Sequence, residues 1–292
     1  MELRHLRYFI AVADELHFGR AAELLGISQP PLSQQIQALE EELGARLFER
    51  TNRRVALTEA GRLFLEEARQ ILAQMGQAAE VARRAQRGEL GQLKLGFTSS
   101  APFTSVIPGA ILRFRQAFPE VQLELHELNS REVADALLNG RIQVGLIRPL
   151  PLPESLVAVE LFREPLVAVL PAQHRLAAEN AGLPLAELAA EPFVYFPRNA
   201  GTGLYDQVIA LAHEAGFSPR ITQESHSALT LIGLVAAGLG VSVLPASFTR
   251  MHFDGVVYRP LLDAGATTAV WLVRRDDERS PLSRAFIELI AP

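Results

Sequence analysis

The chain has 292 residues, 49% of them apolar, and a formal net charge of −5. This length fits two domains of roughly 100 to 200 residues each, with sizeable cores. The lack of cysteine excludes disulfides and thiolate metal sites, and the seven histidines have no metal-ligand spacing, so we expect no metal. No apolar run approaches the roughly 20 residues that span a bilayer and no secretory signal opens the chain, which predicts a cytoplasmic protein.

The charge balance argues against indiscriminate binding of nucleic acid, because coating the phosphates needs clustered positive charge. Residues 1–58 carry seven arginines and eight acidic groups, so even the N-terminal part is near neutral. Arg50, Arg53 and Arg54 lie together in the sequence. The glutamates of residues 40–42 form a separate acidic block. Any binding of nucleic acid by this segment would therefore depend on how its charges are distributed and not on their sum.

The first predicted elements form a helix-turn-helix over residues 18–40. One helix ends at Leu25, Gly26 takes the left-handed conformation that follows it, and Ser28 caps the next helix. The inner face of that second helix consists of apolar residues at helical spacing: Leu32, Ile36 and Leu39. Two prolines stand in its first turn, where backbone N–H groups have no intrahelical partner. The alternative is an ordinary helical hairpin with its polar faces turned to solvent.

The outward face of this second helix is polar and suits contacts to base edges and phosphates. Its candidate DNA contacts are Ser28, Gln29, Pro30, Pro31, Ser33, Gln34 and Gln37. Residues 47–57 follow as a predicted two-stranded wing, whose tip presents Arg53 and Arg54 to the DNA backbone or minor groove. Arg50 is a third candidate contact of the wing. The order of turn, cap, polar face and basic wing favours DNA reading over an ordinary hairpin.

A long helix is expected over residues 59–88, with Thr58 as its N-cap. Apolar residues recur along it at alternating steps of four and three: Phe64, Ala68, Ile71, Met75, Ala78 and Ala82. This spacing is typical of a seam that a helix buries against a partner helix, so we expect the helix to join two chains. The alternative is that the helix packs on its own domain.

After a predicted hinge at residues 88–92, short apolar runs alternate with helical segments. Strands are expected at residues 93–97, 121–125, 144–147, 166–170, 193–196, 221–223, 241–244 and 269–273. Helices are expected at residues 111–118, 131–139, 204–215, 228–237 and 282–290. Such alternation predicts parallel strands joined by helices, and two series with a late return of the chain predict two lobes.

The N-terminal motifs resemble those of the LysR-type transcriptional regulators. The matching stretches are residues 1–9, 18–25, 28–33, 39–50 and 57–61. The resemblance implies a winged helix-turn-helix at residues 1–58, a linker helix that pairs two chains, and commonly a tetramer on two adjacent DNA sites. RNA polymerase is a further partner that it implies. Gln34 stands where many members carry arginine, which puts one phosphate contact in doubt.

The same resemblance implies an effector-binding domain at residues 89–292 that is similar to type 2 periplasmic binding proteins. Lobe I takes in residues 91–161 and 267–292, and lobe II takes in residues 162–266. The fold class is thus an all-α winged helix-turn-helix with a long linker helix, followed by a two-lobed α/β domain. Residues 95–97 and 140–146 are most similar to the branch that regulates breakdown of aromatic compounds and answers to muconate-type or benzoate-type acids.

Candidate effector contacts are polar groups just beyond the predicted strands, where α/β sheets bind ligands. They are Ser99, Ser100, Ala101, Asn129, Ser130, Arg148, Gly201, Thr202, Gly203 and His226. Hydroxyls at a helix N-terminus suit a carboxylate, although plain helix capping by Ser99 and Ser100 is the alternative. Arg148 either meets an anionic ligand or forms a buried ion pair. His226 faces either the cleft or the solvent.

Two other classes of protein fit parts of this pattern. A serine hydrolase would use Ser99 or Ser100 as its nucleophile, but no Gly-x-Ser-x-Gly elbow surrounds them and no His–Asp partner can be assigned. A solute-binding protein of a transport system would need a secretion signal. We therefore expect a DNA-binding regulator, with no catalysis and no cofactor, whose promoter occupancy or bending is controlled by a small, carboxylate-bearing effector.

Overall fold

The computed structural model describes residues 1–51, 54–178, 181–199 and 202–290. The chain divides into two compact units, Met1–Gln86 and Arg87–Pro292. Within the described ranges, no helix has both the length and the apolar character needed to cross a bilayer.

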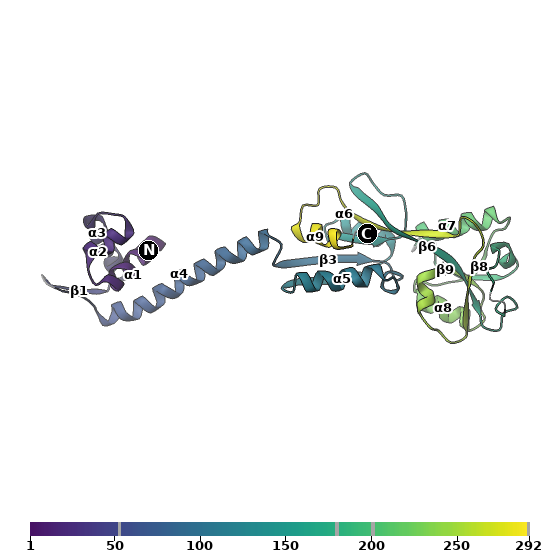
Figure 1. Ribbon diagram of the computed structural model, residues 1–292, viewed down its shortest axis with the longest axis horizontal. Helices are drawn as coiled ribbons and strands as arrows, with labels where there is room; N and C mark the ends of the chain where they lie inside the picture. Colours follow the sequence, from purple (N-terminus) through teal and green to yellow (C-terminus); the bar gives the residue numbers. More distant parts are fainter. Residues whose placement is uncertain (52–53, 179–180, 200–201, 291–292) are drawn as a thin grey trace. The chain divides into compact units, whose positions relative to one another are not determined.

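The N-terminal unit is a helical domain with a small β-hairpin (Figure 1). Its elements are α1 (Leu3–Glu15), α2 (Phe18–Leu25), α3 (Gln29–Leu43), β1 (Phe48–Thr51), β2 (Arg54–Leu57) and α4 (Glu59–Gln86). The two strands pair antiparallel, with Phe48 opposite Leu57 and Thr51 opposite Arg54. Fully buried side chains of α1 and α3 form the core of this unit together with Phe48 and Ala68. The winged helix-turn-helix that the sequence predicts is therefore confirmed.

The turn between α2 and α3 follows the prediction in its backbone but not in its cap. Gly26 has φ 68°, and its N–H donates to the carbonyls at the end of α2. Only a residue without Cβ adopts this conformation freely, which is why α2 ends there. Ser28 occupies the N-cap position of α3, but its side chain makes no capping hydrogen bond, so the predicted cap is wrong. The prolines at positions 30 and 31 lie in the first turn of α3 and set its start instead.

Helix α4 begins by packing on its own domain. Thr58 caps it as predicted, since its Oγ1 accepts a hydrogen bond from the Gly61 N–H at 2.9 Å. The Phe64 ring lies 5.0 Å from the Phe9 ring, and Ala68 is fully buried in the same core. For these two members of the predicted seam, the alternative of packing within the domain is the one observed. Farther along the helix Ile71 is 37% exposed in the single chain.

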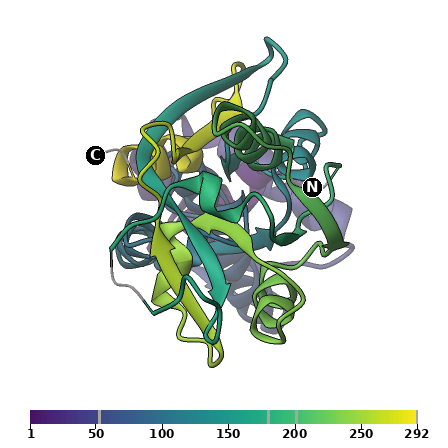
Figure 2. The ribbon, with the colours of Figure 1, turned by 90° about the vertical axis from the view of Figure 1, so that its right-hand side faces the viewer.

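The second unit is an α/β domain with two lobes. Its strands are β3 (Gly91–Phe97), β4 (Val121–Glu127), β5 (Val144–Ile147), β6 (Leu156–Pro171), β7 (Pro192–Tyr195), β8 (Arg220–Glu224), β9 (Ser242–Pro245), β10 (Val256–Pro260) and β11 (Thr267–Arg275). Its helices are α5 (Val106–Ala117), α6 (Ser130–Leu138), α7 (Thr202–Glu214), α8 (Ala228–Ala236) and α9 (Pro281–Ile290), with short 3-10 turns η1 (Ala101–Phe103), η2 (Leu185–Leu188) and η3 (Ala246–Arg250). Figure 2 views this unit from the end that carries α7 and α8.

Lobe I is built on the strand order β4-β3-β5-β11-β6, with α5 and α9 packed on one face and α6 on the other. Lobe II contains β7 to β10 with α7 and α8. Strand β6 belongs to both lobes. Its residues 156–165 pair with β11, and its residues 166–171 pair with β9 and β10. The boundary predicted between residues 161 and 162 falls inside this strand, at an irregularity in its pairing with β11.

The prediction of parallel strands is right for part of the domain and wrong for the rest. Strand β3 runs parallel to β4 and β5, and β7 runs parallel to β8. Strands β6, β9, β10 and β11 pair antiparallel, because the chain crosses into lobe II along β6 and returns along β11. Strand β10 and residues 156–165 of β6 were not predicted. The predicted hinge is also shorter than expected, since β3 already begins at Gly91.

Candidate DNA-binding surface and effector pocket

The outward face of α3 carries every DNA contact predicted for the helix-turn-helix. Ser33 is half-buried and the other six residues are exposed: Ser28, Gln29, Pro30, Pro31, Gln34 and Gln37. The opposite face is fully buried through Leu32, Ile36 and Leu39. This division leaves a polar, uncharged face of α3 available for base edges and phosphates.

A side-chain link that the sequence did not indicate holds α3 against α1. His5 Nε2 lies 2.8 Å from Gln35 Oε1, and His5 Nδ1 accepts a hydrogen bond from the Glu2 N–H at 3.2 Å. The partners stand thirty residues apart, so no local pattern predicts them.

The predicted wing is a hairpin, and its arginines differ in their surroundings. Arg54 begins β2 and is exposed, whereas Arg53 lies outside the described residues. Arg50 is not simply a surface charge, because its Nη2 lies 2.8 Å from Glu40 Oε2. Its guanidinium also sits 4.8 Å above the centre of the Phe18 ring. The sequence predicts a glutamate block separate from the arginines, and for Glu40 this is wrong, because α3 brings its carboxylate back to the wing.

A cavity of about 260 Å³ lies between the lobes, beyond the carboxyl ends of β3, β4 and β5. Six of the predicted effector contacts line it: Ser99, Ser100, Asn129, Ser130, Arg148 and His226. The sequence reasoning did not select the other lining residues: Thr98, Glu127, Leu128, Glu132, Phe196, Leu204, Pro245 and Phe248. The apolar members Phe196, Pro245 and Phe248 come from lobe II and contact the cavity because the two lobes face each other, so their place in the sequence does not mark them.

Two of the remaining predicted contacts, Ala101 and Gly203, are described and do not line the cavity. Ala101 is 1% exposed and belongs to the core of lobe I. A Cβ on Gly203 would lie 1.7 Å from the Pro149 carbonyl oxygen, so this glycine permits close packing of α7 against the segment after β5. Gly201 and the side chain of Thr202 are outside the described residues. Ala101 and Gly203 therefore have packing roles, and their prediction as effector contacts is wrong.

Arg148 forms a buried ion pair, which is one of the two roles that the sequence left open for this residue. Its Nη2 lies 2.6 Å from Glu164 Oε1 and donates to Ser100 Oγ at 2.7 Å, and its backbone N–H donates to Ser130 Oγ at 3.2 Å. Burial lowers the pKa of this guanidinium from its ordinary value, while the Glu164 carboxylate opposes the shift. The Nε atom of Arg148 is buried and has no hydrogen-bond partner among the described residues.

Glu164 joins this ion pair to lobe II. Its second carboxylate oxygen, Oε2, accepts a hydrogen bond from the Ser247 N–H at 2.6 Å. Ser247 belongs to η3, and its neighbour Phe248 packs against Phe103 of lobe I with ring centres 5.5 Å apart. The polar chain, a series of hydrogen bonds from Ser100 and Arg148 through Glu164 to Ser247, therefore runs from the cavity wall of lobe I through β6 into lobe II.

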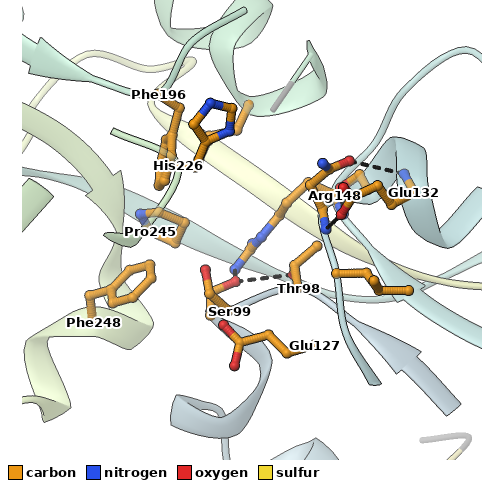
Figure 3. Close-up of a pocket in the computed structure, with 14 residues that line it drawn as sticks. Thr98, Ser99, Glu127, Glu132, Arg148, Phe196, His226, Pro245 and Phe248 are labelled. Atoms are coloured by element: carbon orange, nitrogen blue, oxygen red, sulfur yellow. Dashed lines mark hydrogen bonds between the residues drawn. The ribbon is translucent and has the colours of Figure 1, made fainter. Parts of the chain in front are cut away.

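The cavity has a polar wall and an apolar wall (Figure 3). Lobe I contributes the hydroxyls of Thr98, Ser99 and Ser130 at the N-terminal ends of η1 and α6. Lobe II contributes the side chains of Phe196, Pro245 and Phe248 on the opposite side, and the exposed His226. Such a pair of walls suits a small molecule with a hydrogen-bonding head and an apolar body.

A reciprocal pair of hydrogen bonds fixes the start of α6 and places the Glu132 carboxylate there. Asn129 Oδ1 accepts a hydrogen bond from the Glu132 N–H, and Glu132 Oε2 accepts one from the Asn129 N–H, both at 2.9 Å. This capping box fixes the N-terminal turn of α6, where the helix dipole is positive. Neither Ser99 nor Ser100 has a hydrogen bond to a histidine in the described ranges, so the arrangement needed to activate a serine nucleophile is not formed there.

Both units match known family models. Residues 3–62 match the model of bacterial regulatory helix-turn-helix proteins of the lysR family, and residues 86–292 match the LysR substrate binding domain. The chain is 51% identical over 287 residues to the transcriptional regulator YnfL of Escherichia coli K12, covering 98% of this chain and 96% of the relative.

Solved structures are similar over the whole chain and over its second unit. Full-length CbnR in complex with its target DNA is 31% identical with a TM-score of 0.81, covering 99% of this chain and 98% of that one. The BenM effector binding domain with its effector benzoate is 29% identical with a TM-score of 0.62, covering 68% of this chain and 90% of that one.

Proposed function

The chain belongs to the LysR family of DNA-binding transcriptional regulators, and we propose that a small organic acid held between its lobes controls how it occupies or bends promoter DNA. The family consists of regulators, so the protein is neither a hydrolase nor a transport component and is not an enzyme. The observation that supports the effector most directly is the cavity with hydroxyls on one wall and aromatic rings on the other.

We propose that α3 enters the major groove and that the wing contacts the adjacent backbone or minor groove. The relative CbnR has been solved on its target DNA and matches this chain at nearly full length. The exposed polar residues of α3, Gln29 and Gln34 among them, are the groups that face outward for this role. Glutamine at position 34 carries no charge, so a phosphate contact there is weaker than an arginine would make.

The effector that we propose is a carboxylate with a flat apolar body, of the benzoate or muconate type. The hydroxyls of Ser99 and Ser130 and the start of α6 form the side that receives the carboxylate. Phe196 and Phe248 form the side that receives the apolar body. In support, the related BenM domain was solved with benzoate as its effector. The regulated genes would then belong to breakdown of aromatic compounds.

Within this class, the charges around the cavity favour the singly charged benzoate type over the muconate type, which carries two carboxylates. The guanidinium of Arg148 is neutralised by Glu164 at 2.6 Å, and Glu127 and Glu132 add further negative charge at the lining. An anion here therefore depends on neutral donors and on the helix dipole. The buried Nε–H of Arg148 is one further donor for it.

For the assembly, we propose a dimer through α4 and a tetramer of two such dimers. Beyond the residues that pack on α1, the predicted seam continues through Ile71, Met75, Ala78 and Ala82. Residues 1–58, 59–88 and 89–292 are the DNA-binding, linker and effector-binding parts in this scheme. The protein would act in the cytoplasm, where promoter DNA and RNA polymerase, a further partner, are present.

Effector binding would act through the strands that join the lobes. A ligand that touches both walls is bound better in one arrangement of the lobes than in another, and only this difference can shift the equilibrium. A difference of about 1–3 kcal/mol would change DNA occupancy or bending roughly 5- to 150-fold. The polar chain from Arg148 through Glu164 to Ser247 lies between the walls and would sense such a change.

A three-ligand comparison tests this proposal. Benzoate should raise the melting temperature of the full chain and change its affinity for a duplex that it has selected from a random-sequence library. Benzamide, which keeps the ring but loses the charge, and acetate, which keeps the charge but loses the ring, should do so far less. Equal shifts with benzamide would contradict the requirement for a carboxylate, and equal shifts with acetate would contradict the requirement for an apolar body.

A further inference from the structure

One carboxylate of α3 holds the wing hairpin. Glu40 Oε1 accepts hydrogen bonds from the backbone N–H groups of Leu47 and Phe48, at 2.8 Å and 3.0 Å. Glu40 Oε2 lies 2.8 Å from Arg50 Nη2 in β1. Both oxygens of this side chain are therefore used by the segment that leads into the hairpin and by the hairpin itself. Bonds to a charged acceptor are shorter and stronger than neutral ones.

The hydrophobic core supports this link from the other side. The Arg50 guanidinium lies 4.8 Å above the Phe18 ring, and the Phe18 ring meets the Phe48 ring edge-on at 5.9 Å. The side chain of Glu40 is 13% exposed and that of Arg50 is 29% exposed, so solvent screens this pair less than the surface pairs of the domain. Residues from α2, α3 and β1 thus meet at one ion pair.

We propose that Glu40 is a positioning residue for DNA binding, which sets the wing against α3 without contacting DNA itself. Helix α3 and the hairpin must reach adjacent grooves at the same time, so the angle between them decides whether Arg54 meets the DNA. A groove that includes Glu40 and Arg50 in its lining separates α3 from β1, and the carboxylate bridges it. The inference goes beyond the family's DNA binding and rests on the proposed contact of the wing.

The proposal predicts a change whose sign is opposite to simple electrostatics. Removing a negative charge near DNA reduces repulsion from the phosphates and should by itself strengthen binding. Loss of the positioning bonds should weaken it. Glu41 is the matched control, because it is the exposed neighbour of Glu40 in α3 and has no hydrogen bond or ion pair from its side chain among the described residues.

The experiment compares full-length Glu40→Gln, Glu41→Gln and the parent on the library-selected duplex at several salt concentrations. Glu40→Gln should bind about 10-fold more weakly, as expected for the loss of a charge-assisted bond, and with a shallower salt dependence because wing contacts are lost. Glu41→Gln should bind as tightly as the parent or more tightly. Titration at duplex concentrations far above the dissociation constant gives the active fraction and so separates weaker binding from partial unfolding.

Two further variants keep the test decisive. Arg50→Gln should also weaken binding, and the double variant should lose less than the sum of the two single losses, because both changes break the same ion pair. If Glu40→Gln does not fold, Arg50→Gln gives the same measurement with the backbone bonds of Glu40 intact. Arg54→Ala tests the contact between the wing and DNA. An unchanged salt dependence in this variant would overturn that proposed contact. Parent-like binding by Glu40→Gln, or an equal loss in Glu41→Gln, would overturn the positioning role.

Discussion

The buried pair between Arg148 and Glu164 leads to a stability prediction that the structure makes quantitative. The side chains are 4% and 11% exposed, so Glu164→Gln would leave a guanidinium in the interior without its counter-charge. Breaking such a pair by removing one partner costs about 3–5 kcal/mol, and we expect about 3 kcal/mol because glutamine still accepts one hydrogen bond. Over a unit of this size that corresponds to a fall in melting temperature of about 6–12 °C.

The assay is thermal and urea unfolding of the full chain, followed by the fluorescence of Trp271, the only tryptophan, which lies in β11 of lobe I. The control is Glu160→Gln on the same strand, which breaks the exposed pair of Glu160 with Arg163 at 2.7 Å. That loss should be below about 1 kcal/mol, because solvent already screens the pair. Replacing both partners, as Arg148→Met with Glu164→Leu, should recover part of the loss, because the unpaired charge is removed while the Ser247 N–H still loses its acceptor. Equal losses in Glu164→Gln and Glu160→Gln would refute the reasoning.

Arg53→Ala and Arg54→Ala should each weaken binding to all duplexes and lower the salt slope by about one, measured by anisotropy titration, and an unchanged slope would remove the residue from the interface. Gly203→Ala should lower the melting temperature of the α/β unit, since its Cβ would lie 1.7 Å from the Pro149 carbonyl oxygen; parent-like melting would show that α7 can move aside. Ser130→Ala should reduce the response of DNA binding to benzoate while basal affinity stays near that of the parent. Equal loss of response and basal affinity would indicate misfolding instead.

The helix-turn-helix was predictable because its determinants are local. The left-handed glycine after α2, the prolines that open α3 and the buried residues at helical spacing all lie within a few turns of one another. The predicted capping bond of Ser28 is not formed, because such a bond depends on the side-chain rotamer and not on residue type alone. Strand β5 of lobe I, whose four residues are all buried, was predicted from a short continuous apolar run.

Strand β6 is only partly predictable from the sequence pattern. Residues 166–170 are fully buried and give the apolar run that the sequence predicts. Residues 157–165 are exposed or half-buried. The apolar run Leu156-Val157-Ala158-Val159 has the same residue types as residues 166–169, but it lies largely on the surface and was not predicted as a strand. Residues 157–165 form a strand because β11 lies beside them and supplies hydrogen-bond partners. The antiparallel sheet order followed from that pairing and could not be read from a series of strands and helices.

The candidate cavity was half predictable. Its polar wall was found because hydroxyls and amides follow the strands directly in the sequence, as at Ser99 and Asn129. Its apolar wall was missed because Phe196 and Phe248 differ in no local way from core residues. The sequence also left Arg148 between two roles, and only the approach of Glu164 from β6 decided for the ion pair.

The amino-acid sequence by itself determined the order of the domains, the helix α3 with its polar outer face, and the polar wall of the cavity. Each of these depends on residues within one or two elements, where spacing and side-chain type are sufficient. The tertiary structure decided which charges neutralise each other, which glycines permit close packing, and how the lobes share β6. Those features depend on contacts between groups that are distant along the chain. Helical or strand periodicity carries no information about such contacts.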